Sequence, residues 1–98
     1  SSDSRLKSNI QDAASASDKI DAIQVRQFDW NETGNHQDYG LIAQELQPIE
    51  PLAVVGSPDS DEMMGIDNSK LVPMLIKAVQ EQQATIKLLE TRLAALES

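Results

Sequence analysis

Apolar residues in the last thirty positions recur at alternating spacings of three and four. They are Val72, Leu75, Val79, Ile86, Leu89, Leu93 and Leu96, with the polar Gln82 at the one remaining place. This heptad rhythm predicts one long helix over residues 69–98 with a seam for a partner helix. Ser69 is the predicted N-cap, and Pro73 suits the first turn.

Two interpretations of this stripe stay open at this point. The helix either associates with copies of itself or lies on its own core. Beyond Ile86, self-association is favoured because too little chain is left to cover the stripe. The distribution of Val and Ile on one side of the seam and Leu on the other favours parallel helices, with Gln82 as a device that fixes register or oligomeric state.

Residues 1–68 predict a small α+β head, and residues 69–98 the long C-terminal helix. A short helix is expected to begin at Ser15, its cap, with Asp18 in the first turn. A hairpin is expected next, with a turn around Gly34 between its two strands. The two strands of this hairpin are expected at residues 25–30 and 39–43, and further strands at 52–55 and 63–67. A short helix is expected at 44–47, and the prolines that follow should end it.

Composition argues that this head is too small to be stable alone. It holds fewer than seventy residues with one Phe, one Trp and one Tyr, and the chain has no cysteine. A core of that size is marginal, and oligomerisation is the remaining remedy. Phe28, Trp30 and Tyr39 are expected in the core, with a contact to a partner as the alternative. The absence of cysteine fits assembly in a reducing compartment, and no apolar run suits a membrane span or a signal peptide.

Charge and spacing exclude several classes of function. The head carries thirteen Asp and Glu against four Lys and Arg, so we expect no nucleic acid among its partners. Asp59, Asp61 and Glu62 hint at a calcium loop, but the remaining ligand spacing is missing, and we expect no metal or cofactor. His36 is expected to be exposed in a polar turn. No glycine-rich phosphate loop or metal spacing indicates a small-molecule enzyme.

Four stretches, in the right order, resemble one known family. Residues 2–10, S-D-S-R-L-K-S-N-I, resemble the S-D-x-R-x-K-x-N-I opening of the intramolecular chaperone domains of the peptidase S74 family. The other three are F-D-W at 28–30 with T-G at 33–34, G-L-I-A-Q-E at 40–45, and D-N-S-K-L-V-P-M-L-I-K-A at 67–78. The resemblance implies the C-terminal homotrimeric chaperone of a bacteriophage tail fibre, tail spike or endosialidase. Such a domain helps the upstream segment of its precursor to fold in the host cytoplasm, then cuts itself off and is shed.

Carried over by position, the resemblance makes Ser2 the nucleophile and Lys7 its base. Asp3, Arg5 and Asn9 match the motif without an assigned step. Some relatives have a histidine just before the glycine of the G-x-I-A-Q stretch. Here Asp38 and Tyr39 stand in that place, with His36 a little upstream, which puts a histidine contribution in doubt. Ser1, which precedes the serine of the motif, is a second departure from the family pattern. Ser1 either lies on the other side of the cut, or is a cloning remnant, or is itself the nucleophile. We prefer Ser2 as the nucleophile.

Geometry limits how Ser2 and Lys7 can meet. In an extended chain five residues span roughly 16 Å, and in a helix they lie about 140° apart around the axis. Either the segment bends back, or Lys7 of one subunit serves Ser2 of another. A neutral lysine could then take the serine proton, if burial or a nearby cation favours its neutral form. The expected attack is on the peptide bond preceding Ser2, through an N-to-O acyl shift. A non-catalytic trimerisation or coiled-coil adaptor module is the alternative function.

Overall fold

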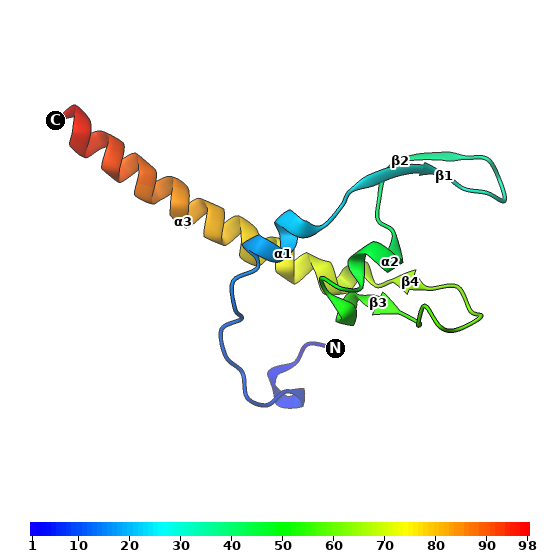
Figure 1. Cartoon of the computed structure of the whole chain (residues 1–98). Coiled ribbons are helices and arrows are strands. Elements are labelled where there is room, and N and C mark those ends of the chain that lie inside the picture. The colour runs from blue at the N-terminus through cyan, green and yellow to red at the C-terminus, as the bar shows by residue number, and fades with distance from the viewer.

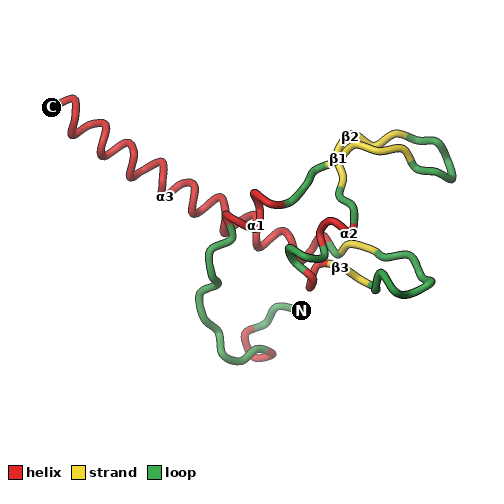
Figure 2. The backbone as a smooth tube through the Cα atoms, viewed as in Figure 1, coloured by secondary structure: helices red, strands yellow, loops and turns green.

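The computed structural model describes residues 1–98 and shows a long rod with the other elements gathered around one end of it (Figure 1). The rod is helix α3, Leu71–Glu97. An N-terminal segment hangs away from it, and two β-hairpins project on the side opposite the free end of the rod (Figure 2). The predicted α+β head with a long C-terminal helix is confirmed. No helix is both long and apolar enough to span a membrane.

Helix α3 begins differently from the sequence prediction. A 3-10 turn, Asn68–Lys70, leads into it, and Asp67 is the residue that caps this turn. The Asp67 carboxylate accepts hydrogen bonds from the Ser69 amide at 3.1 Å and the Ser69 hydroxyl at 2.6 Å, and these bonds lower the pKa of Asp67. The predicted Ser69 cap is therefore wrong, because Ser69 donates where a cap would accept. Pro73 does lie in the first turn of α3, as expected.

The short helix α1, Ser17–Ala22, packs against α3. Its N-cap is Ala16, which has no capping side chain. The carboxylate of Glu81, on α3, instead accepts the hydroxyl of Ser15 and the amide of Ala16, the latter at 2.7 Å. The predicted Ser15 cap is wrong for this reason: its hydroxyl points across to another helix rather than along its own.

The first hairpin joins β1, Arg26–Asp29, to β2, His36–Gly40, with Gly34 in the left-handed conformation of the turn. The hairpin and its turn are confirmed, but the predicted second strand at 39–43 is wrong. The strand lies earlier and ends at Gly40, and helix α2, Ala43–Leu46, begins where a strand was expected. A bulge shifts the register between the pairs Arg26 with Gly40 and Phe28 with Gln37, and Leu41 then turns into the core.

The strands expected at 52–55 and 63–67 are shorter than predicted, and they pair with each other as a second hairpin. Strand β3, Val54–Val55, pairs with β4, Gly65–Ile66. Residues 52–55 were predicted as one strand, but their first half belongs to a 3-10 turn, Pro51–Ala53, that Pro51 opens. Proline fits that place because its fixed φ suits the first position of a helical turn.

The core of one chain is very small. Leu46, Ala53 and Leu71 form it, and they are 2%, 0% and 8% exposed. Five half-buried apolar residues surround them: Ile23, Leu41, Val54, Ile66 and Met74. Only five of the 98 residues are buried at all. One subunit therefore buries little of the apolar surface that its sequence provides.

Candidate functional site

The residues of the opening motif lie in an exposed N-terminal arm, residues 1–15, which touches the rest of the chain only at its last residues. Asp3 caps a 3-10 turn, Ser4–Leu6. Its carboxylate accepts the Arg5 amide at 2.9 Å and both guanidinium nitrogens Nε and Nη2, at 3.1 and 2.7 Å. These bonds hold the pKa of Asp3 below its ordinary value. Leu6 and Ile10, the large apolar residues of the arm, are both about 70% exposed and do not anchor it to the core.

Ser2 precedes this turn in the sequence and Lys7 follows it. The amide of Lys7 donates to the carbonyl of Ser4 at 3.1 Å, so the segment bends rather than running extended. Both side chains are exposed, and neither has a hydrogen-bond or ion-pair partner in the structure. One chain therefore bends the segment between the two residues without joining them by a hydrogen bond or burying the lysine.

A clasp at Glu81, formed with Ser15 and Ala16, fixes the point where the arm leaves the rod. The hydrogen bond from Ser15, followed by that from Ala16, lowers the pKa of Glu81, so the clasp is made by the ionised carboxylate. Ala16 and Ala78, which lie beside it, are buried. Sequence reasoning missed this contact because its partners are 65 and 66 residues apart and carry no shared motif.

The apolar stripe of α3 is exposed along its whole length in one chain. Its seven apolar members, Val72, Leu75, Val79, Ile86, Leu89, Leu93 and Leu96, are 49–84% exposed. The residues that α3 uses inside its own chain are different ones: Leu71, Met74, Ala78 and Glu81. At about 100° per residue, the two stripes are roughly a quarter turn apart. We call the exposed stripe the seam.

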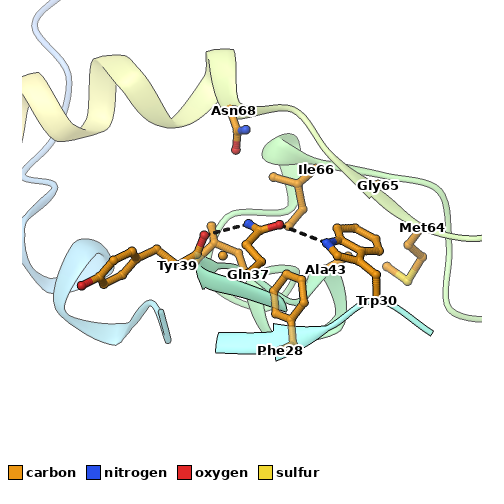
Figure 3. A pocket seen from close by; sticks show the side chains of 11 residues that line it. Phe28, Trp30, Gln37, Tyr39, Ala43, Met64, Gly65, Ile66 and Asn68 are labelled. Carbon is orange, nitrogen blue, oxygen red and sulfur yellow. Dashed lines mark hydrogen bonds between the residues drawn. The ribbon is translucent and has the colours of Figure 1, made fainter. Parts of the chain in front are cut away.

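A pocket opens between the first hairpin and strand β4 (Figure 3). Phe28 and Trp30 meet edge to face in its wall, with ring centroids 5.4 Å apart. The Gln37 side chain links two residues of this wall: its oxygen accepts a hydrogen bond from the Trp30 indole at 3.2 Å, and its nitrogen donates to the Tyr39 carbonyl at 2.7 Å. Trp30 is 55% and Tyr39 81% exposed, and Phe28 is half-buried. Their predicted place in the core is wrong for a single chain, because the small core forms elsewhere.

His36 lies in strand β2 rather than in a turn, and its side chain is about half exposed. Its Nδ1 is 2.6 Å from Asp29 Oδ1, and its Nε2 is 3.1 Å from both Asp38 Oδ1 and Gln27 Oε1. The hairpin that carries it and the N-terminal arm lie on different sides of the molecule (Figure 1). Within one chain His36 is therefore not part of a site with Ser2.

No group of histidine and acidic side chains in the structure is arranged to hold a metal ion. Asp59 and Asp61 lie in the loop between β3 and β4, where the amides of Asp59 and Glu62 donate to Ser57 and Ser60. The hydroxyls of Ser57 and Ser60 therefore each accept a backbone amide in this loop, as serine commonly does in turns.

Comparison with known proteins gives the family. The family model described as the chaperone of endosialidase matches residues 2–55. The chain is also similar to the long tail fiber protein Gp37 of Enterobacteria phages K3 and T2, with 31% identity in each case over 94% of this chain. It spans only 8% and 7% of the length of those two relatives. The match to the family model covers more than half of the chain and includes the whole opening motif, so the chain belongs to the peptidase S74 family.

Proposed function

We propose that this chain is the intramolecular chaperone of a phage tail fibre or a related protein. It assembles as a parallel homotrimer, holds three copies of an upstream segment in register, and then cuts itself off before Ser2. In this proposal the work is done in the cytoplasm of the host bacterium during virion assembly, and the cut chaperone is shed. The observation that carries the proposal is the opening motif, held on an exposed arm beside a helix with an uncovered seam.

The amount of exposed surface supports association. One chain exposes 8272 Å². A compact monomer of its mass, 10.7 kDa, exposes about 5,500 Å². Its radius of gyration is 18.5 Å, against about 13 Å for a compact chain of this length. Many large apolar side chains form part of this exposed surface, and burying them against other copies would be favourable.

The chemistry proposed for the cut follows from the two motif residues. The neutral amine of Lys7 takes the proton of the Ser2 hydroxyl, and the Ser2 oxygen attacks the carbonyl carbon of the peptide bond before it. The tetrahedral intermediate expels the Ser2 nitrogen, which takes up a proton and becomes the new amino terminus. The acyl group is left as an ester on the Ser2 oxygen, and water hydrolyses that ester.

Assembly is the step that makes this chemistry possible. A lysine amine in water is almost wholly protonated at neutral pH, and burial or a neighbouring cation favours its neutral form. In one chain Lys7 is exposed, and the only cation within two residues of it, Arg5, is paired with Asp3. Contact with a neighbouring subunit, or with the upstream segment, would supply the missing burial. Cleavage then reports that folding is complete.

The test uses a precursor in which the upstream fibre precedes this chain. Mass spectrometry after expression should find the wild-type precursor cut between Ser1 and Ser2. Ser2→Ala should remain uncut because it lacks the hydroxyl. Lys7→Arg should also remain uncut because it keeps the positive charge but cannot act as a base. Ser8→Ala, in the same exposed arm, is the matched control and should be cut normally. A Ser2→Ala precursor cut at the normal place would contradict the proposal.

Whether Lys7 acts within its own chain or on a neighbour is tested by co-expressing Ser2→Ala and Lys7→Arg precursors. In mixed trimers, action between chains allows the intact Lys7 of one chain to serve the intact Ser2 of another, and some Lys7→Arg chains are cut. Action within one chain leaves every mixed trimer uncut. The two results assign the base to one arrangement or the other.

A non-catalytic trimerisation module is the second candidate, and one observation favours it: Ser2 and Lys7 make no contact within a chain. It predicts an intact wild-type precursor in stable trimers. The same mass measurement therefore separates the two candidates.

A further inference from the structure

The opening motif contains polar residues that the proposed chemistry does not use. Asp3 and Asn9 are two of them, and every residue of the arm from 1 to 14 is exposed. Where no tertiary contact fixes a segment, its shape depends on its own hydrogen bonds and backbone preferences. Asp3 shapes the arm through its hydrogen bonds, and Asn9 shapes it through its backbone conformation.

Asp3 fixes the bend between the two reactive residues. Its side chain accepts the amide two residues ahead, which is the Asx arrangement that mimics a backbone turn. Two backbone bonds follow, from Leu6 to the Asp3 carbonyl at 3.0 Å and from Lys7 to the Ser4 carbonyl at 3.1 Å. Each such bond keeps the α-carbons at its ends within about 7 Å. Arg5 holds the same carboxylate in its guanidinium fork, which keeps the cap in place.

Asn9 fixes the direction in which the chain leaves Lys7. Its φ is 54°, and it is the only non-glycine residue in the chain with a positive φ. Its side chain makes no hydrogen bond in the structure. Asparagine is one of the few residues that adopt this left-handed conformation at modest cost. Asn9 therefore contributes its left-handed backbone conformation to the structure rather than a side-chain interaction.

We infer that Asp3 and Asn9 are positioning residues for the proposed cleavage: Asp3 folds the turn between Ser2 and Lys7, and Asn9 bends the chain just after Lys7. This inference rests on the proposed function. It means that one subunit carries the cleavage segment already folded. Assembly then has to add burial and a partner surface, not the shape of the segment.

The experiment compares rates of cut in the assembled precursor, using pairs of variants at each position. Asp3→Ala removes the cap and should slow the cut about fivefold, whereas Asp3→Ser, whose hydroxyl can also cap, should stay within about twofold of wild type. Asn9→Ala makes the left-handed backbone costly and should slow the cut about tenfold. Asn9→Gly adopts that backbone freely and should stay close to wild type. Circular dichroism and sedimentation should show unchanged trimers for all four, because the arm lies outside the core.

The paired design separates backbone shape from side-chain chemistry. If Asn9→Gly is cut as slowly as Asn9→Ala, the amide group itself takes part and the inference fails for Asn9. If Asp3→Ala is cut at the wild-type rate, or Asp3→Ser is as slow as Asp3→Ala, it fails for Asp3. An uncut wild-type precursor would instead overturn the proposed function and this inference with it.

Discussion

At the scale of single residues, Glu81 has the most informative contact in the chain. One carboxylate replaces the missing cap of α1 and also fixes the base of the N-terminal arm. A helix start leaves several amides without partners, and an anion placed there is favoured by the helix dipole as well. The residue that caps α1 is therefore supplied by a helix far along the sequence.

The Glu81 clasp should weaken in acid. Its folded-state pKa is lowered below the ordinary value of 4.5, chiefly by the Ser15 hydroxyl. The stabilisation is therefore present in full above that pH and is lost as the pH falls through the lower folded value. We predict that Glu81→Gln lowers the melting temperature at neutral pH, and that its difference from wild type shrinks below pH 4.5. Hydrogen exchange at the Ala16 amide gives a local measure of the same loss.

A suitable control for this prediction is Glu90→Gln, an exposed acid on the same helix that takes part in no ion pair in the structure. It should melt like wild type across the whole pH range. A melting difference between Glu81→Gln and wild type that does not change with pH would show that the charge of Glu81 plays no part in the clasp.

At the scale of elements, α3 presents two apolar stripes, and only one of them is used within the chain. Its head-facing stripe begins at Leu71 and reaches Ala78, both buried, whereas the seam runs on to Leu96. Every residue of α3 beyond Glu81 is exposed, and the last part of the rod extends away from the other elements (Figure 1). An isolated helix of that length is marginal in water and is normally stabilised by packing.

We predict that the seam, and not apolar exposure as such, holds the subunits together. Ile86 and Leu88 are 49% and 50% exposed, but only Ile86 lies in the seam. Ile86→Asp should dissociate the oligomer because it places a charge between the helices, whereas Leu88→Asp should leave it assembled. Sedimentation equilibrium of the two variants at one concentration measures the difference. Equal dissociation of both would mean that the helices do not meet along this seam.

At the scale of the whole molecule, the stability of one chain should depend on the concentration of the others. A core of three buried residues, without disulfide or metal, is far below what a domain of this size needs. We predict that the chain sediments with three times the mass of 10.7 kDa, and that its helical circular dichroism falls on dilution as subunits separate. A helical single subunit that persists over a wide range of concentration would contradict this.

Local rules predicted the parts of the fold that depend on nearby residues. The spacing from Val72 to Leu96 was enough for the long helix, and Gly34 for the first hairpin. The same rules placed the second strand too late, because a bulge near Tyr39 and the packing of Leu41 depend on the core rather than on strand propensity.

In the candidate site, too, features set by nearby residues could be predicted and contacts between distant residues could not. The family resemblance of the opening motif assigned Ser2 and Lys7, and the bend between them was one of two geometries left open by their separation. The Glu81 clasp could not be predicted because it joins distant residues by a contact that any acid and any hydroxyl can make. The aromatic side chains Trp30 and Tyr39 were misplaced because general rules assign large apolar groups to a core, whereas the small core of this chain forms around Leu46, Ala53 and Leu71.

The position of the Glu81 clasp has a consequence for how a fibre would be separated from its chaperone. In the proposed trimer, three rods in parallel and in register would place their three clasps at one height, so the three arms would leave as a ring around a common axis. Because each arm has the same length, the three proposed scissile bonds would lie in one transverse plane. The fibre would be released with three flush ends, and none of its strands would carry a longer tail than the others.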